Sequence, residues 1–499
     1  PIQVSIGQFY GIEINDFAVT VAKTALWIAE SQMHKETMDI LPVKIPFLPL
    51  KSYANIVEGN ALRMNWNDVV PKEKLNYIMG NPPFVGARLM GQEQKDDVNL
   101  IFKGWKNAGN LDYVACWYKK ATDMMVDADI RSALVSTNSV CQGETVANLW
   151  KPLFATGVHI DFAHRTFRWD SEASIKAHVH CVIVGFSTVP NYKQKRLYSS
   201  ERVQLVDNIN AYLISAPTVF IESRTQSICD VPQMVYGNKP TDGGFLFLSP
   251  EEKEDIAKNE PSALKYVRQI YGATEYINNK ARYCLWLVGI SPAELRSSAF
   301  IRDRVEKVRE FRLSSTKDAT RRSADTPALF QEIRHPDSQY IIIPRHSSEN
   351  RKYIPFGFVN PEIIVNDAVQ IIPNAELYHF GIMMSNVHMA WTRAVCGRIK
   401  SDYRYSKDVV YNNFPWPTPT DEQKAAIEKT AQTILDARAL YPDCSLADLY
   451  DEVAMPPELR KAHQANDRAV MQAYGFDVKT MTESTCVAEL MKMYQELTK

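Results

Sequence analysis

The 499-residue sequence lacks the features that mark several classes of protein. No apolar run approaches the roughly 18 to 20 residues of a membrane-spanning helix, and no charged stretch leads into an apolar one as in a signal peptide. The eight cysteines are scattered without any C-x-x-C pair, which argues against structural zinc and against a disulfide scaffold. We therefore expect a cytoplasmic protein of two or three domains with no membrane partner.

The sequence also lacks a strong net charge, but the formal value of −1 hides a division along the chain. Residues 302–322 hold eight Lys or Arg against four acids, and residues 393–407 hold five against one. Residues 418–499 hold 14 acids against nine bases. One basic run is typical of a solvated helix face, whereas two runs in one region modestly favour a surface for a polyanion.

The first 190 residues alternate between short apolar segments and helix-like segments. Segments bounded by Gly, Asn and Ser predict strands at 9–14, 56–57, 75–79, 132–136, 159–167 and 178–186. Helices are predicted from Asp16, as the N-cap, to Met33, and over 113–126 and 144–154. This alternation predicts an α/β fold with a doubly wound, mostly parallel sheet, in which ligands bind beyond the carboxyl ends of the strands.

After about residue 200 the chain has many prolines and short apolar runs, such as 340–343 and 363–365, which predict a mixed α+β domain. Three prolines within residues 415–419 cannot continue a helix and mark a boundary. Helical apolar spacing follows, beginning with a helix over 421–441. The predicted domains are 1–200 (α/β), 201–412 (α+β) and 413–499 (helical).

Asn81-Pro82-Pro83-Phe84 stands at the end of a predicted strand in the middle of the predicted sheet. Asn-Pro-Pro also makes a good turn, but the position at a carboxyl edge favours chemistry. The Asn81 side-chain oxygen and the Pro82 carbonyl can accept the hydrogens of an exocyclic amino group, which frees the lone pair of its nitrogen. Phe84 offers an aromatic face to a base taken out of its stack.

This tetrapeptide resembles the hallmark of the amino-methyltransferases of DNA. Further segments are similar to MmeI-type (type IIL) restriction–modification enzymes: GIEI at 11–14, GNAL at 59–62, STNS at 136–139, QGE at 142–144, PRHSSE at 344–349 and YNNFPWP at 411–417. The resemblance covers nearly the whole chain. It implies an incomplete Rossmann-like methyltransferase domain dependent on S-adenosylmethionine, then a target-recognition domain and a helical C-terminal domain.

The resemblance also implies S-adenosyl-L-methionine as the cofactor and assigns residues to it. Glu13, followed by Ile14, ends the strand whose acid binds the cofactor ribose, although an acid there also suits a helix start. Asn60 and Ala61 match the block that touches the cofactor adenine, where the family usually has Asp. Asn81 completes the predicted cofactor-binding set, and Asn81 to Phe84 form the predicted catalytic set.

Residues 396–406 carry the second basic run and predict a specificity element. If this stretch is extended, Lys400 and Asp402 point to the same side. Lys can donate to guanine O6 and N7 and Asp can accept from cytosine N4, so we hypothesise that they read one G·C pair; a surface ion pair is the alternative. The other predicted DNA-binding residues are Arg345, Ser347, Ser348, Arg351, Lys352, Arg398 and Arg404.

The predicted function is transfer of a methyl group to adenine N6 of a flipped-out base in a specific double-stranded DNA sequence. Methylation of cytosine N4, methylation of an RNA amino group, and a non-catalytic DNA-binding specificity protein stay open as alternatives. His178 and His180 alternate on a strand without a third ligand, so no metal site is expected.

One departure from the family bears on activity. The family has a glycine-rich turn upstream of the block at Phe9, whereas eight residues precede Phe9 here and Gly7 is their one glycine. No nuclease cluster is assignable either. We therefore expect this chain to be part of a longer protein that binds the cofactor weakly and is inactive alone, with an upstream nuclease region of the same polypeptide as a candidate partner.

Overall fold

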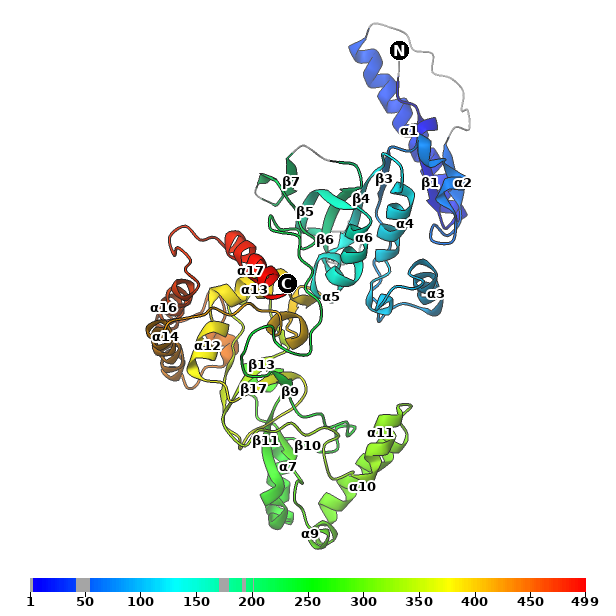
Figure 1. Cartoon of the computed structure of the whole chain (residues 1–499). Helices are drawn as coiled ribbons and strands as arrows, with labels where there is room; N and C mark the ends of the chain where they lie inside the picture. The colour runs from blue at the N-terminus through cyan, green and yellow to red at the C-terminus, as the bar shows by residue number, and fades with distance from the viewer. Residues whose placement is uncertain (1–2, 42–53, 170–178, 191–193, 201) are drawn as a thin grey trace. The chain divides into compact units, whose positions relative to one another are not determined.

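The computed structural model of the chain describes residues 3–41, 54–169, 179–190, 194–200 and 202–499 (Figure 1). The chain divides into two compact units. Unit 1 comprises residues 1–141 and 145–220, and unit 2 comprises residues 142–144 and 221–499. Within the described ranges, none of the helices is both long enough and apolar enough to cross a membrane.

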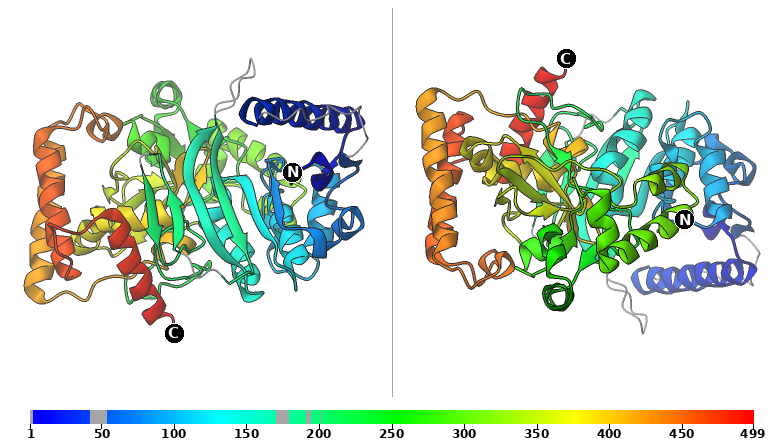
Figure 2. Two further views of the ribbon diagram at one scale, coloured as in Figure 1. Left: turned by 90° about the horizontal axis from the view of Figure 1, so that it is seen from above. Right: turned by 90° about the horizontal axis from the view of Figure 1, so that it is seen from below.

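Unit 1 contains two sheets. The smaller is a parallel pair of β1 (Tyr10–Glu13) and β2 (Asn55–Glu58). The larger has the strand order β3-β4-β6-β5-β7-β8, and its strands lie side by side in Figure 2. These strands are β3 (Tyr77–Gly80), β4 (Arg131–Thr137), β5 (His159–Trp169), β6 (Val179–Ser187), β7 (Lys195–Tyr198) and β8 (Val203–Val206).

A strand forms at each predicted position within the described residues, but the prediction of a mostly parallel sheet is wrong. In the larger sheet β3–β4 and β5–β7 are parallel, whereas β4–β6, β5–β6 and β7–β8 are antiparallel. A parallel neighbour requires a crossover of a dozen or more residues. Nine residues of sequence separate β5 from β6 and four separate β7 from β8, and both of these pairs are antiparallel. The prediction that the tetrapeptide follows a strand in the middle of the sheet is also wrong. Among the described residues, β3 is an edge strand of this sheet.

The helices of unit 1 form at the predicted places, but α1 (Asp16–Ile40) continues beyond the predicted end at Met33. Asn15, and not Asp16, caps α1, because its side chain accepts a hydrogen bond from the Ala18 amide. The predicted helix over 144–154 is divided into α5 (Gly143–Thr145), a π-helical turn (Val146–Trp150) and α6 (Lys151–Ala155). Pro152 has no N–H to continue a regular α-helical ladder there. The remaining helices are α2 (Trp66–Val69), α3 (Gln92–Ile101) and α4 (Ala115–Met125).

The core of unit 1 joins α4 to the larger sheet through three fully buried aromatic residues. The ring of Tyr118 lies 5.2 Å from those of Trp150 and Phe186. The Tyr118 hydroxyl is 2.7 Å from Ser136 Oγ of β4, and Trp150 Nε1 donates to the Val140 carbonyl at 2.8 Å. Each buried side chain of this size contributes about 1.5 to 3 kcal/mol. The polar atoms of Tyr118 and Trp150 both have hydrogen-bond partners. The carboxyl end of β4 is therefore held firmly.

Unit 2 begins with a mixed α+β region, as predicted. Its sheets have the orders β10-β12-β11-β16, β15-β13-β17-β9 and β14-β19-β18. The strands are β9 (Val235–Tyr236), β10 (Phe247–Leu248), β11 (Val267–Tyr271), β12 (Tyr283–Leu285), β13 (Tyr340–Pro344), β14 (His346–Ser347), β15 (Gly357–Val359), β16 (Ile364–Val365), β17 (Val369–Pro373), β18 (Gly397–Ile399) and β19 (Asp402–Arg404). The helices are α7 (Pro250–Asn259), α8 (Ala273–Ile277), α9 (Pro292–Ser297), α10 (Ala299–Leu313), α11 (Asp318–Arg322), α12 (Leu377–Met383) and α13 (Asn386–Val395).

The end of the chain is helical, as predicted, with α14 (Asp421–Ala439), α15 (Leu446–Leu449), α16 (Pro457–Ala473) and α17 (Glu483–Leu497). Helices α14 and α16 lie side by side in both views of Figure 2. The proline-rich segment before α14 is buried in unit 2. The side chains of Asn412 and Asn413 donate to the carbonyls of Arg224 and Glu222, and Phe414 is fully buried. This segment therefore anchors the helical end of the chain to the α+β region.

Candidate functional site

The tetrapeptide directly follows β3 at the carboxyl edge of the larger sheet. Pro82 is buried, Phe84 is partly buried and Asn81 is exposed. Because β3 and β4 are parallel, their carboxyl ends lie at the same edge. The buried proline anchors the turn and leaves the Asn81 side chain open to solvent.

The loop after the tetrapeptide is tied to the end of β4. The Val85 carbonyl accepts from the Tyr113 amide at 2.9 Å, and the Ala87 amide donates to Asp112 Oδ1 at 2.9 Å. Asp112 Oδ2 accepts from the Ser139 hydroxyl at 2.6 Å. Sequence reasoning matched Ser139 to the family but gave Asp112 no role, because no local pattern marks a carboxylate that bridges two distant loops.

Asn60 lies in a second cluster, centred on the buried carboxylate of Asp97 in α3. Asp97 accepts from Asn60 Nδ2 at 3.1 Å, from Arg63 Nε at 2.6 Å and from the Tyr113 hydroxyl at 2.7 Å. Asn60 Oδ1 accepts from the Leu62 amide at 2.9 Å. The side chain of Asn60 therefore holds its own turn against α3.

The Asp97 cluster perturbs the titration of its members. Burial by itself raises the pKa of Asp97, but the hydrogen bonds from Tyr113, Arg63 and Asn60 outweigh it and leave that pKa below its usual value. Burial, followed by the hydrogen bond to Asp97, raises the pKa of the Tyr113 hydroxyl. Asp97 is thus a stable anion and Tyr113 a stable donor, which suits a fixed structural link between two loops.

Glu13 is connected to this cluster through the backbone. It ends β1 with an exposed side chain, and its carbonyl accepts from the Gly59 amide at 2.7 Å. Hydrogen bonds therefore link the blocks at Glu13, Asn60 and Val85 in succession. Among the described residues, however, no strand pairing joins β1 to β3, so Glu13 and Asn81 follow strands of two different sheets.

The two predicted recognition segments, 345–352 and 396–406, come together in one three-stranded sheet. Strand β14 pairs with β19, and β19 pairs with β18. Residues 142–144 belong to unit 2, as this sheet does. Gly143 has φ +58°, and a Cβ atom there would lie 3.2 Å from the Cα of Gly397 in β18. A side chain at position 143 would therefore crowd the first residue of the hairpin.

The premise that Lys400 and Asp402 lie on one extended strand is wrong. Lys400 occupies the two-residue turn between β18 and β19 with φ +56°, and Asp402 is the first residue of β19. A hairpin turn allows this left-handed conformation and interrupts strand alternation. Both side chains are exposed at the tip, and Asp402 Oδ1 accepts from the Glu349 amide at 3.2 Å.

Several other predicted DNA-binding side chains have partners within the fold. Arg345 Nη1 donates to the Asp367 carbonyl at 2.8 Å, and Arg398 Nη1 donates to the Ser401 carbonyl at 2.8 Å. Arg398 stacks on the Tyr403 ring at 3.9 Å. Further contacts are Arg351 Nη1 to Ser347 Oγ, Asn350 N to Ser348 Oγ, and Lys352 Nζ over the Tyr353 ring. These contacts orient the side chains within the fold. Lys352, Lys400 and Asp402 are exposed.

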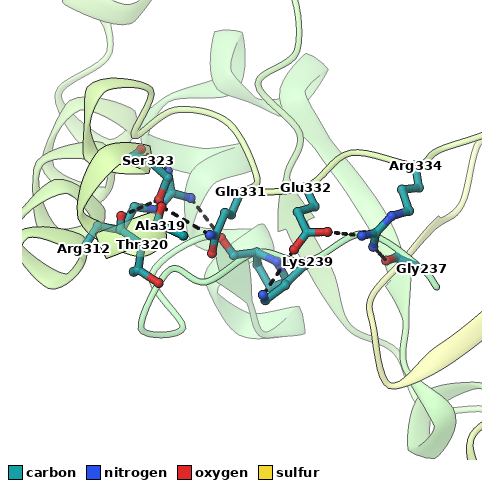
Figure 3. A network of polar contacts seen from close by, with 10 residues as sticks. Gly237, Lys239, Arg312, Ala319, Thr320, Ser323, Gln331, Glu332 and Arg334 are labelled. Atoms are coloured by element: carbon teal, nitrogen blue, oxygen red, sulfur yellow. Dashed lines mark hydrogen bonds and ion pairs between the residues drawn. The ribbon is translucent and has the colours of Figure 1, made fainter. Parts of the chain in front are cut away.

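Four of the eight cations of the first basic run, 302–322, are paired with carboxylates of the protein itself, and a fifth, Arg312, is buried. Arg312 is fully buried and donates to five backbone carbonyls (Figure 3 shows this region). The other paired cations are Arg304 with Glu252, Lys307 with Asp303, Arg309 with Glu306, and Arg321 with Asp318. This region therefore offers less cationic surface than its composition suggests.

Within the described ranges, no three His, Cys, Asp or Glu residues gather in a way that could hold a metal ion. His178 lies outside the described residues, and His180 is part of β6. All eight cysteines are free.

An Asn-Pro-Pro-Phe turn on an α/β unit, followed by a sheet that gathers exposed polar residues, defines a class of modification enzyme with in-chain target recognition. The chain matches three family models in succession: the DNA-methyltransferase domain of MmeI at residues 1–199, the target recognition domain of MmeI at 215–418, and the C-terminal domain of MmeI at 419–499. The chain belongs to the MmeI family, which confirms the resemblance inferred from its motifs.

Two known proteins show the extent of the similarity. The chain is 38% identical over 498 residues to DNA methyltransferase A of Bacillus subtilis (strain 168), covering 99% of this chain and 56% of that protein. It is 45% identical to the type IIL restriction–modification enzyme MmeI, solved in complex with DNA, with a TM-score of 0.89 over 100% of this chain and 67% of that chain. The chain thus spans about half the length of the curated relative.

Proposed function

We propose that this chain transfers a methyl group from S-adenosyl-L-methionine to adenine N6 of a flipped-out base at a specific sequence in double-stranded DNA. The observation that supports this most is the exposed Asn81 on a proline-fixed turn at the carboxyl end of β3. Membership of the MmeI family supports DNA as the substrate. In this proposal the chain acts in the cytoplasm, and its partners are duplex DNA and an upstream nuclease region of the same polypeptide.

The chemistry follows from the acceptors on the turn. An exocyclic amino nitrogen is a poor nucleophile because its lone pair is delocalised into the base ring. The Asn81 side-chain oxygen and the Pro82 carbonyl accept its two hydrogens, which favours a pyramidal nitrogen with an available lone pair. The Phe84 ring stacks on the extruded base. Pro82 and Pro83 restrict the backbone, so both acceptors are oriented before the base arrives.

S-adenosyl-L-methionine supplies the electrophilic methyl group when it is bound. In the proposed site the exposed carboxylate of Glu13 binds ribose hydroxyls, and the exposed side chain of Ile14 offers an apolar contact beside it. Ala61 and the backbone of Asn60 face the adenine, since the Asn60 amide is engaged by Asp97 and Leu62. Asn81 completes the set near the reacting nitrogen.

An Asn81→Ala substitution tests the catalytic assignment. With upstream residues of a family member supplied, we expect loss of at least about 100-fold in methyl incorporation into unmodified genomic DNA, because a preorganised acceptor of this kind contributes about 3 to 4 kcal/mol. Duplex binding, measured by gel shift, should change less than about twofold. Asn76→Ala, at an exposed asparagine before the other end of β3, is the matched control. Retained methylation in Asn81→Ala would refute the assigned role.

A non-catalytic specificity protein is the second candidate, and one observation favours it: Glu13 and Asn81 follow strands of two separate sheets. Under this alternative the chain binds duplex DNA but incorporates no methyl group, even when supplied with upstream residues of a family member. Cytosine N4 and RNA amino groups require the same acceptor chemistry. Comparing radiolabel in adenine, cytosine and RNA distinguishes them from the leading proposal.

We propose that Lys400 and Asp402, at the hairpin tip, read one G·C pair in the major groove. The proposal is supported by their exposure and by their place in the sheet that gathers both recognition segments. A combined Lys400→Glu, Asp402→Arg exchange should change the preferred base at one position of the methylated sequence.

Sequencing of methylated sites measures the preference of that double variant. The matched control exchanges charge in an exposed ion pair of α17, Lys492→Glu with Glu489→Lys, which should leave the preference unaltered. If the Lys400 and Asp402 exchange also leaves every position unaltered while methylation continues, the two residues form a surface pair with no reading role.

A further inference from the structure

Asp112 is a partly buried carboxylate that the proposed chemistry does not use. It lies two residues before Val114, the residue that precedes α4, and it contacts two segments far from it in sequence. No Lys, Arg or His in the described ranges pairs with it as a salt bridge; its partners are a backbone amide and a hydroxyl. A carboxylate with this set of partners acts as a bridge between loops.

One side of the bridge holds the loop of the tetrapeptide. Asp112 Oδ1 accepts from the Ala87 amide at 2.9 Å, and the neighbouring Tyr113 amide donates to the Val85 carbonyl at 2.9 Å. These two bonds fix residues 85–87, which begin directly after Phe84. The Leu89 amide also bonds the Gly86 carbonyl at 2.8 Å, so the loop turns tightly at this point.

The other side of the bridge holds the end of β4. Asp112 Oδ2 accepts from Ser139 Oγ at 2.6 Å, and Ser139 Oγ lies 2.8 Å from Thr137 Oγ1, at the last residue of β4. The strand itself is fixed by the buried contact between Ser136 and Tyr118. Asp112 therefore couples the position of the loop to the end of β4.

We propose that Asp112 is a positioning residue that holds the Asn81–Phe84 turn in register with the end of β4, so that its acceptors are oriented for the target amino group. This inference rests on the proposed function for its catalytic consequence, but the bridge is a property of the free chain. A shift of about 1 Å in such acceptors costs about 100-fold in rate. In this proposal Asp112 acts through the loop at 85–87 and not by its own contact with the base or the cofactor.

Asp112→Ala and Asp112→Asn distinguish positioning from charge. Alanine removes both bonds, and we expect at least about tenfold faster amide exchange over residues 85–89 of the free chain. With upstream residues of a family member supplied, we expect about 10- to 100-fold lower kcat for methyl transfer. KM for DNA should change less than about threefold. Asparagine restores the bridge, since its oxygen accepts from Ala87 N and its NH2 donates to Ser139 Oγ, so exchange and kcat should stay within about threefold of wild type.

Asp123→Ala is the matched control, because Asp123 is an exposed aspartate on α4 paired with Lys119; it should change neither readout. If Asp112→Ala does not fold, Ser139→Ala supplies the test: it removes one half of the bridge, and faster exchange at Ala87 is expected.

Unchanged exchange in the loop, or an asparagine variant as impaired as the alanine variant, would overturn the inference. If the wild-type chain incorporates no methyl group even when supplied with upstream residues of a family member, while the exchange differences appear, the proposed function fails and the bridge stands. The two failures are therefore distinguishable in one set of proteins.

Discussion

At the scale of single residues, Arg312 belongs to a basic run that is typical of a solvated helix face, but the fold buries it. All five of its N–H groups are satisfied: Nε donates to the Thr241 carbonyl, Nη1 to those of Ser323 and Thr326, and Nη2 to those of Pro240 and Leu329. The planar guanidinium thus joins α10 to the segment at Pro240 and Thr241, between β9 and β10, and to the segment 323–329 that follows α11. A buried cation of this kind stabilises only as long as every bond is made.

Arg312→Met should therefore destabilise this part of unit 2 by about 3 to 5 kcal/mol, because five carbonyls lose their donor in a buried site. Amide hydrogen exchange over residues 299–332 measures the local loss. Arg312→Lys should recover only part of it, since an ammonium has three donors. The control Arg309→Met removes an exposed pair with Glu306 and should cost no more than about 1 kcal/mol; equal effects at both positions would contradict the structural role.

At the scale of elements, the contact between α16 and the start of α13 depends on one buried carboxylate. Asp467 Oδ1 accepts from the Asn386 amide, the first of α13, at 2.7 Å, and Oδ2 accepts from the Tyr353 hydroxyl at 2.6 Å. A helix N-terminus has unpaired amides and favours negative charge. Burial nevertheless dominates and raises the pKa of Asp467 to about 6, against the opposing effect of those two bonds.

A folded pKa above the unfolded value of 3.8 means that the stability contributed by the protonated form is fully present below pH 3.8 and is lost as the pH rises through 6. The full loss is on the order of 3 kcal/mol. Asp467→Asn cannot ionise, so its unfolding temperature should rise relative to wild type between about pH 4 and pH 6. Asp443→Asn, at an exposed position, should show no such trend. A constant difference across this range would show that Asp467 ionises normally.

At the scale of the whole molecule, the separation of the two sheets in unit 1 bears on cofactor binding. The edge of β3 away from β4 is unpaired among the described residues, and Tyr77 and Met79 are 68% and 78% exposed. Glu13 is linked to the tetrapeptide loop through several successive hydrogen bonds and not through a shared sheet. A binding site needs its groups held within about 0.5 Å of their working positions.

We therefore expect this chain to bind S-adenosyl-L-methionine with a Kd in about the millimolar range, equivalent to about −4 kcal/mol. Isothermal titration calorimetry measures it directly, with Glu13→Ala as the variant that should weaken it further. A micromolar or tighter complex formed by the wild-type chain would contradict the expectation and would show that the hydrogen bonds alone orient the site.

Much of the fold was predictable because the signals are local. Strand segments bounded by turn residues, the helical spacing after Thr420, and the prolines at 415–419 act within a few residues of themselves. The same holds for Asn81 to Phe84, whose place at a strand end follows from the apolar run before it. The features that were predicted wrongly depend on which strands pair, such as the antiparallel pairing of β6 with β4 and with β5.

The sequence by itself thus determined the main strands and helices of unit 1, the order of the α/β, α+β and helical regions, and the place of the tetrapeptide at the end of a strand. Only the tertiary structure decided that Asp112 joins Ala87 to Ser139, that Arg312 is buried, and that the two recognition segments share one sheet. Lys400 was placed in a turn by the pairing of its two flanking strands. The physical reason is separation along the chain: burial and long-range hydrogen bonds depend on residues tens of positions away, which local periodicity does not report.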